Sequence, residues 1–321
     1  MDWFKKISLV LICMVCFQTA RAEWVKQNAN TLAWLHDIYF FDETRGFIAG
    51  SGGAFLETKD GGKSWTKRKN FTADKILQIH FSDDYTGWLL CERDIFSRGA
   101  KAVSYLMKTT DGGETWERAE FKDAGRARIA RIFFNAQGRG FAIGESGAFF
   151  ELRDDGNWER SASTIRYLLL DGAFFDSARG AMVGGGGTAY FTEDAGANWI
   201  QANLAGTSAA KLNALYFADR KNGWTVGTGG KILQTASGGK TWREQNSGVT
   251  KDLFDVFFKN ASEGWAVGDE GVILRTNTGG NVWAAEQTGT KHKLEKVLFV
   301  GGKGFAVGFG GTILVSGQNT K

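Results

Sequence analysis

The side chains best placed for chemistry in this sequence are aspartates that recur in one fixed context. They lie in the pattern T-x-D-x-G-x-x-W, first met at residues 58–65. Paired carboxylates are the catalytic groups of glycoside hydrolases, but an aspartate in a tight turn also accepts backbone N–H bonds beside a glycine of positive φ. Because the whole pattern repeats, we interpret it as a β-hairpin tip with a structural acid. Its complete copies supply Asp60, Asp111, Asp194, Trp65, Trp116 and Trp199.

A second set of candidate residues is cationic and lies between the copies of this pattern. The second unit of the chain carries an insert over residues 93–103, and the loops that enter the second and third units add further Lys and Arg. We predict a basic face that docks an acidic partner. The alternative is that these cations form a solvent-exposed rim with no partner, because acids such as Glu92 and Glu120 alternate with them along the sequence. The predicted basic face consists of Arg68, Arg93, Arg98, Lys101, Lys122, Arg126 and Arg128.

Motifs for metal, phosphate or nucleophilic chemistry are incomplete. The three histidines are far apart and form no zinc-ligand spacing. The run at residues 62–64 resembles the end of a P-loop, but Glu57 stands where the first glycine is required. The run at residues 144–147 lacks the final glycine of a nucleophile elbow. We therefore expect no enzyme, no cofactor and no metal site.

The N-terminus indicates export. Two lysines, an apolar run and the small-x-small triplet at residues 20–22 form a signal peptide over residues 1–22, whose apolar part is too short to span a bilayer. Cys13 and Cys16 do not follow the small residue that bacterial lipidation requires, so we expect no lipid anchor and no integral membrane span. The mature protein would be periplasmic or secreted, or lumenal in a photosynthetic organism.

Net charge and the number of cysteines give further information on partners and on stability. A formal net charge of +4 over 321 residues is too small to indicate a nucleic-acid-binding protein. Cleavage of the signal leaves Cys91 as the single cysteine, so no internal disulfide can form and stability must come from packing.

An internal repeat organises the chain. The box tryptophans recur at roughly 40- to 50-residue intervals from Trp65 to Trp283, a spacing typical of propellers, and Trp24 lies one interval before the first. A second marker, usually glycine followed by an aromatic residue as in Gly223-Trp224, occurs seven times. The residue pattern of each repeat unit predicts four short strands.

The two ends of the chain decide between an open array and a closed ring. The last unit, residues 294–315, supplies three strands, and residues 23–27 supply the missing fourth. Pairing the ends removes an exposed edge strand. We predict an all-β, seven-bladed β-propeller of four-stranded blades, a single domain over residues 23–321, and a monomer.

The inner strands place polar residues along an otherwise apolar pattern. Their third positions are Asp37, Gln78, Arg131, Gly172, Ala214, Asp255 and Lys296. We predict that Asp37, Arg131, Asp255 and Lys296 line a water-filled central channel, while their mixed signs also fit mutual salt bridges. Because strand direction alternates, the loops between second and third strands share a face with the blade-to-blade loops, where the basic residues gather, and the box tips lie opposite.

The repeat resembles that of the photosystem II stability/assembly factor family. The residues that carry the resemblance are N-G-W-T-V-G at 222–227, K-I-L-Q-T at 231–235 and G-G-K-T-W at 238–242, and unit six agrees with G-W-A-V-G at 264–268. The resemblance covers residues 23–321. It implies a seven-bladed, lumenal or periplasmic, non-enzymatic protein that binds membrane-complex subunits during assembly. Ser237 and Thr278 depart from the pattern by replacing the box aspartate.

We therefore favour an exported scaffold whose partners are subunits of a membrane-protein complex or their exported segments. The alternative is a sialidase-like glycoside hydrolase or a glycan-binding propeller. Sialidases carry a proline-containing arginine motif near the N-terminus, whereas this chain has no proline.

Overall fold

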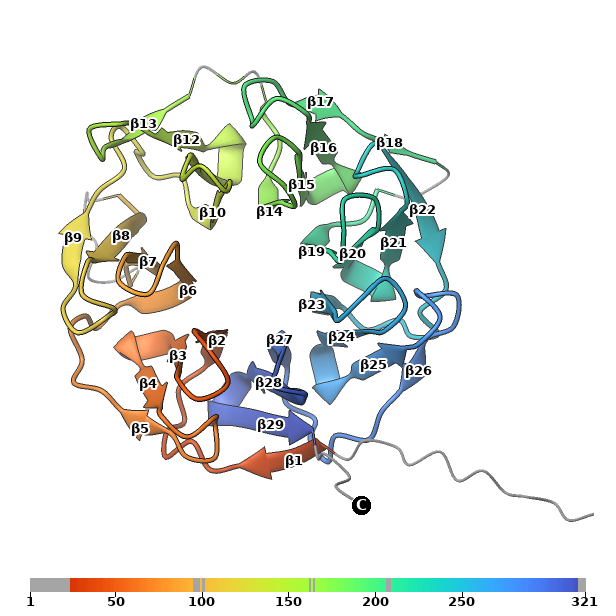
Figure 1. Cartoon of the computed structure of the whole chain (residues 1–321), viewed down its shortest axis with the longest axis horizontal. Helices are drawn as coiled ribbons and strands as arrows, with labels where there is room; N and C mark the ends of the chain where they lie inside the picture. The colour runs from red at the N-terminus through yellow and green to blue at the C-terminus, as the bar shows by residue number, and fades with distance from the viewer. Residues whose placement is uncertain are drawn as a thin grey trace, which may run out of the picture.

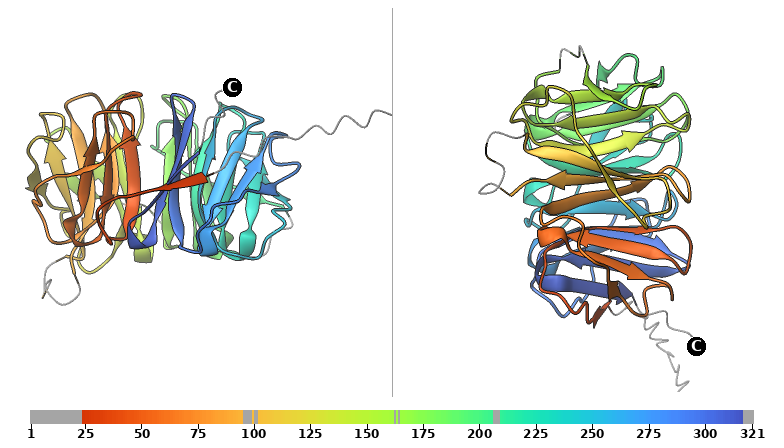
Figure 2. Two further views of the ribbon diagram at one scale, coloured as in Figure 1. Left: turned by 90° about the horizontal axis from the view of Figure 1, so that it is seen from below. Right: turned by 90° about the vertical axis from the view of Figure 1, so that its left-hand side faces the viewer.

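Seven β-sheets are arranged as a ring in the computed structural model of the chain (Figure 1). The structure describes residues 24–94, 99, 102–161, 163, 165–205 and 209–316. Six sheets have four strands, and the seventh has a fifth strand added at its edge. Side views show the sheets stacked as the blades of a ring (Figure 2). The predicted all-β, seven-bladed propeller is confirmed.

The strands of each blade follow one another from the channel to the rim, except in blade 7. Blade 1 has β2 (Leu35–Phe40), β3 (Gly46–Gly50), β4 (Phe55–Thr58) and β5 (Thr66–Lys67). Blade 2 has β6 (Lys75–Phe81), β7 (Gly87–Glu92), β8 (Ser104–Thr109) and β9 (Glu117–Ala119). Blade 3 has β10 (Ile129–Phe134), β11 (Gly140–Gly144), β12 (Phe149–Leu152) and β13 (Trp158–Arg160). Blade 4 has β14 (Leu169–Phe174), β15 (Gly180–Gly184), β16 (Ala189–Thr192) and β17 (Ile200–Gln201).

The remaining blades repeat this order. Blade 5 has β19 (Leu212–Phe217), β20 (Gly223–Gly227), β21 (Ile232–Thr235) and β22 (Thr241–Gln245), with β18 (Asn203–Leu204) parallel to β22. Blade 6 has β23 (Leu253–Phe258), β24 (Gly264–Gly268), β25 (Ile273–Thr276) and β26 (Ala284–Ala285). Blade 7 has β27 (Leu294–Val300), β28 (Lys303–Gly308), β29 (Thr312–Ser316) and β1 (Trp24–Gln27).

The ring is closed by the two ends of the chain. Strand β1 pairs antiparallel with β29, from Trp24 opposite Ser316 to Gln27 opposite Ile313. Figure 1 shows β1, in red, beside β29, in blue. The Trp24 indole Nε1 also donates a hydrogen bond of 2.8 Å to Glu286 of blade 6. The predicted closure by the N-terminal strand is therefore confirmed.

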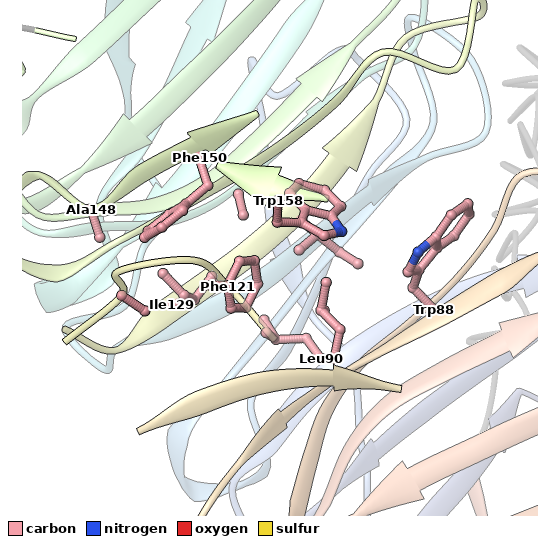
Figure 3. Packing of buried hydrophobic residues seen from close by; sticks show 11 residues of the cluster. Trp88, Leu90, Phe121, Ile129, Ala148, Phe150 and Trp158 are labelled. Atoms are coloured by element: carbon pink, nitrogen blue, oxygen red, sulfur yellow. The ribbon is translucent and has the colours of Figure 1, made fainter. Parts of the chain in front are cut away.

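The core is divided among the interfaces between blades, because each thin sheet buries both faces against its neighbours. The second strand of a blade, such as β3, is buried along its whole length, which explains its unbroken run of glycine and apolar residues. Figure 3 shows Trp88 of β7 and Trp158 of β13 in the cluster between blades 2 and 3. Trp158 is fully buried and meets Phe121 edge-on, with ring centroids 5.7 Å apart.

Each complete Asp box makes a tight turn between the third and fourth strands. The Asp60 carboxylate accepts the Ser64 amide at 2.9 Å and the Thr58 hydroxyl at 2.8 Å. The Thr58 hydroxyl in turn accepts the Gly62 amide at 2.9 Å, and Gly62 has φ +71°, a conformation that favours glycine. Hydrogen bonds from Ser64 and Thr58 to the ionised acid lower the pKa of Asp60 to about 2.

Two tips keep this turn without a carboxylate. The hydroxyls of Ser237 in blade 5 and Thr278 in blade 6 accept the amides of Thr241 and Val282, each at 3.0 Å. A neutral hydroxyl oxygen therefore forms the same turn. We expect the stabilisation by the tip to depend on pH only where the tip carries an aspartate.

Ring closure predicts a large effect of one side chain in β1. Trp24→Ala should lower the free energy of unfolding by about 3–5 kcal/mol, the usual loss for a buried tryptophan, measured by urea titration. Val25→Ala on the same strand is the control, because Val25 is 54% exposed, and it should change stability by less than about 0.5 kcal/mol. Equal effects of the two substitutions would contradict closure through Trp24.

The Asp-box turn predicts a pH-dependent contribution to stability. Because the pKa of Asp60 is lower in the folded protein than in the unfolded chain, the carboxylate stabilises the fold above about pH 4, and this stabilisation is lost as the pH falls towards 2. Asp60→Asn should therefore cost about 1 kcal/mol near neutral pH and little in strong acid, measured by denaturant titration across pH. Ser237→Asn, which removes no charge, should show no such trend; parallel pH profiles for the two variants would refute the prediction.

Candidate functional site

The ring has two unlike faces. On the first, which we call the loop face, turns between second and third strands meet the connections between blades, and the Ser51 amide donates to the Trp34 carbonyl at 2.8 Å. On the second, the tip face, the Asp-box tips meet the loops between first and second strands, and the Gly61 amide donates to the Thr44 carbonyl at 2.8 Å. The described residues of the predicted insert, 93–94, 99 and 102–103, lie between β7 and β8 in the chain, which is the position of the loop-face turns in the other blades.

On the channel wall, inner strands are tied to the next blade by side chains. Each inner strand carries a register shift after its first residues, and a polar side chain follows it in six of the seven blades. The Asp37 carboxylate accepts the Ile79 amide of blade 2 at 2.8 Å. In the same way, Asp255 accepts the Val297 amide of blade 7 at 2.9 Å.

In blade 4 the sequence-based assignment was wrong by one residue. The third position of β14 is Asp171 and not Gly172, and the register shift between Leu169 and Asp171 is the one that every inner strand has. The Asp171 carboxylate accepts the Leu215 amide of blade 5 at 2.8 Å, as the Asp37 carboxylate accepts the Ile79 amide between blades 1 and 2. The error lay in the alignment of the repeat, since residues 169–171 (L-L-D) match residues 35–37 (L-H-D) of blade 1.

The charged groups of the channel wall pair with one another. Arg131 Nε lies 2.7 Å from Asp171 Oδ1, and Lys296 Nζ lies 3.0 Å from Asp255 Oδ1. Burial raises the pKa of Asp37 and of Asp255, and the Lys296 charge opposes this shift. These contacts favour the salt-bridge interpretation of the predicted channel residues over a purely water-lined wall.

A cavity of about 400 Å³, which we call the mouth, lies on the loop face, where the inner strands begin. Its lining combines cations and aromatic rings from several blades. Lys293 Nζ lies 3.6 Å from the ring centroid of Phe254 and 5.1 Å from that of Trp34, so the ammonium is held between two aromatic faces. The cations are Lys75, Arg128, Lys211 and Lys293.

The carboxylates at this mouth are already engaged, and Glu92, which is not part of the lining, pairs with Lys75 and Arg128. Glu295 is the one carboxylate among the residues that line the cavity. It lies 2.6 Å from His36 Nδ1 and 3.0 Å from Lys293 Nζ. Although burial opposes the shift, the hydrogen bonds from His36 and Lys293 hold the pKa of Glu295 below its usual value. The carboxylate is therefore an ionised partner of the wall.

Several polar groups of the mouth have no partner within the described part of the chain. Trp34 Nε1 and His36 Nε2 are buried without a hydrogen bond, and Lys211 is exposed without an acidic neighbour. A mouth with spare donors, excess positive charge and aromatic walls can hold an anionic or carbonyl-rich segment.

The predicted basic face is mostly ion-paired where the structure describes it. Arg93 is 6% exposed and donates to the Ala102 carbonyl at 2.7 Å, which anchors the insert. Arg126 is exposed and has no acidic partner among the described residues. Arg98 and Lys101 lie outside the described residues. The observed pairs are Arg68–Glu114, Arg93–Glu120, Lys122–Glu159 and Arg128–Glu92.

Among the described residues of the predicted basic face, Arg128 alone also lines the mouth. Reasoning from the sequence did not single out Trp34, Phe254, Lys211 and Lys293 as candidates. All four lie in or just before an inner strand, at the end that faces the loop side, so their common position in the repeat was the signal that could have found them.

The other reactive side chains are embedded in the core. Burial raises the pKa of the Cys91 thiol to about 12 and lowers that of His80 to about 4. Within the residues that the structure describes, no three His, Cys, Asp or Glu side chains are grouped to hold a metal ion. No helix in that part of the chain is long and apolar enough to cross a membrane.

A seven-bladed ring with repeated Asp-box tips, closed by its N-terminal strand, defines an Asp-box β-propeller. The sequence profile described as "Photosynthesis system II assembly factor YCF48" matches residues 17–96, 151–236 and 234–321. The chain belongs to this family.

Curated relatives agree with this assignment. The chain is 26% identical over 285 residues to "Photosystem II assembly lipoprotein Ycf48" of Synechococcus sp. (strain CC9902), which covers 72% of this chain and 83% of that protein. It is 25% identical over 261 residues to "Photosystem II assembly protein Ycf48" of Thermosynechococcus vestitus, with coverages of 69% and 74%.

Solved structures share the fold. The structure "YCF48 bound to D1 peptide" superposes with a TM-score of 0.74 at 21% identity and covers 93% of this chain and 98% of that one. A virginiamycin B lyase from Staphylococcus aureus superposes with a TM-score of 0.73 at 10% identity, covering 92% and 99%. At these identities the likeness concerns architecture alone.

The paired charges of the channel wall predict coupling between two side chains. Lys296→Met leaves Asp255 buried without its nearest cation and should cost about 3 kcal/mol or more in the free energy of unfolding. Asp255→Asn combined with Lys296→Met should cost less than Lys296→Met alone, so a double-mutant cycle by urea titration should give a clear coupling energy.

The same cycle has an expected pH dependence. In Lys296→Met the pKa of Asp255 rises further above its value in the unfolded chain, so the variant loses stability as the pH rises through that pKa. The defect should therefore be larger near neutral pH than in mild acid. Additive effects of the two substitutions at both pH values would show that the pair is not coupled.

Proposed function

We propose that this protein is a non-enzymatic, exported scaffold that binds a segment of a membrane-protein complex subunit while that complex is assembled. The family assignment supports an assembly role. The related structure whose title names a D1 peptide supports a polypeptide segment as the ligand. Relatives named as lipoproteins support a location outside the cytoplasm, periplasmic or lumenal.

The observation that carries this proposal is the cationic, aromatic mouth on the loop face. Lys211 supplies a free positive charge there, and Arg126 supplies another on the neighbouring loop that enters blade 3. Trp34 and Phe254 offer flat apolar walls. An extended segment with acidic side chains fits this combination, because long-range attraction guides it and the rings hold its apolar parts.

A glycoside hydrolase of the propeller type is less well supported. A xyloglucanase from Xanthomonas campestris shares the architecture, with a TM-score of 0.71 at 13% identity. Glycosidases of the usual kind need two carboxyl groups across the scissile bond, whereas Glu295 is the one acid lining this mouth and is bonded to His36 and Lys293. Binding without turnover agrees better with these side chains.

Reversal of charge on the loop face tests this proposal. Arg126→Glu combined with Arg128→Glu should abolish co-purification of membrane subunits with the tagged mature protein, because Arg126 is an exposed cation without an acidic partner among the described residues and Arg128, which pairs with Glu92, lines the mouth proposed to receive the acidic segment. The control is Lys63→Glu combined with Lys221→Glu, which makes the same change in charge on exposed loops of the tip face. Capture at the wild-type level by the first variant, with an unchanged melting temperature, would refute the assignment of the loop face.

A further inference from the structure

The tip face carries a second cavity, and its position follows from how blade 7 is built. In blades 1, 2, 4, 5 and 6 a complete tip connects the third strand to the fourth. In blade 7 the third strand, β29, ends at Ser316, and the fourth strand, β1, begins at Trp24 at the other end of the chain. No described residue therefore forms a tip that leads from β29 into β1.

In the other blades the tip packs on the preceding blade in a recurring way. A backbone carbonyl of the tip accepts a hydrogen bond from a side chain of that blade: Gly61 from Lys303 at 3.3 Å, and Gly279 from the Trp224 indole at 3.2 Å. The next residue is a glycine that lies against a side chain of that blade. Gly62 touches the ring of Phe305 so closely that an added Cβ would lie 2.5 Å from it.

The corresponding position over blade 6 is a cavity of about 360 Å³. Trp265 of β24 occupies the place that Trp224 has in blade 5 and that Phe305 has in blade 7. The cavity is also lined by Tyr216, Phe257 and Phe299. Phe299 stacks on Trp265 with ring centroids 3.8 Å apart, so the wall is aromatic and ordered.

Two donors at this cavity have no acceptor among the described residues. Trp224 Nε1 donates to the tip of blade 6, whereas the equivalent Trp265 Nε1 makes no hydrogen bond there. Arg275 Nε is buried and unpaired, although its terminal nitrogens lie 2.7 Å from Glu263 and 3.8 Å from Glu286. Those two acids already balance the guanidinium charge. The acceptor that best fits the unpaired N–H groups is therefore a neutral carbonyl oxygen rather than an anion.

We propose that this cavity binds a glycine-containing β-turn of a partner polypeptide. One carbonyl of the turn accepts the Trp265 indole N–H, and a glycine of positive φ lies against the aromatic wall, as the tips of the other blades do within this chain. The site lies on the face opposite the mouth and does not depend on the function proposed above.

The test uses a probe taken from this chain. A head-to-tail cyclic peptide that contains the sequence of residues 58–65 holds the Asp-box turn, and a matched peptide with valine in place of both glycines cannot adopt it. The indole N–H resonances of the full-length mature protein are followed by nuclear magnetic resonance, and that of Trp265 is assigned with Trp265→Phe. Trp224 is the internal control, because its indole already donates to Gly279.

The glycine peptide should shift the Trp265 resonance in a saturable way and leave Trp224 unmoved, and the valine peptide should shift neither. By calorimetry, Trp265→Phe should weaken binding of the glycine peptide roughly tenfold, the loss expected for one hydrogen bond. An unmoved Trp265 resonance, or equal shifts with both peptides, would overturn the proposal. Binding that appears only after deletion of residues 317–321 would also overturn it, since the chain's own end would then fill the site.

Discussion

The structure depends on packing seven blades face to face around a ring, with the last blade against the first. On the channel wall an inner-strand side chain crosses every interface, and most of these bonds satisfy backbone groups of the next blade. A buried polar group left without a partner costs about 1–3 kcal/mol, so these bonds set which strands can be neighbours. In the order of the interfaces, from blades 1 and 2 to blades 7 and 1, the side chains that bond to the next blade are Asp37, Gln78, Arg131, Asp171, Asn213, Asp255 and the Glu295–His36 pair.

The topology of the ring also shapes both candidate sites. Because all inner strands begin on the loop face, the side chains near their first residues meet there and form the cationic mouth around Lys293 and Phe254. Because the fourth strand of blade 7 comes from the other end of the chain, no tip joins β29 to β1, and the Trp265 cavity lies at that place on the opposite face. The common direction of the inner strands thus accounts for the first candidate site, and the split blade 7 accounts for the second.

Much of the fold could be predicted because its signals are periodic: the box tryptophans, the glycine–aromatic marker and the position of Trp24 gave the number of blades and the closure. Partners from distant parts of the chain could not be predicted. The polar position of blade 4 was misaligned by one residue, although Asp171 stands two residues after Leu169 as Asp37 does after Leu35. For Arg68, Arg93 and Lys122 the sequence left a docking face and a rim of interleaved acids both open, and the structure pairs them with Glu114, Glu120 and Glu159. The mouth was missed because its residues share a position rather than a type.

Native-state hydrogen exchange of the backbone amides in β1 and β29 tests cooperative closure most directly. If the N-terminal strand locks the ring, the most protected amides of both strands should exchange only through global unfolding, with the same opening free energy as the inner strands. Exchange of the β1 amides through local fraying, several kcal/mol more easily than the inner strands, would contradict the account, because the ring would then remain folded without its fourth strand in blade 7.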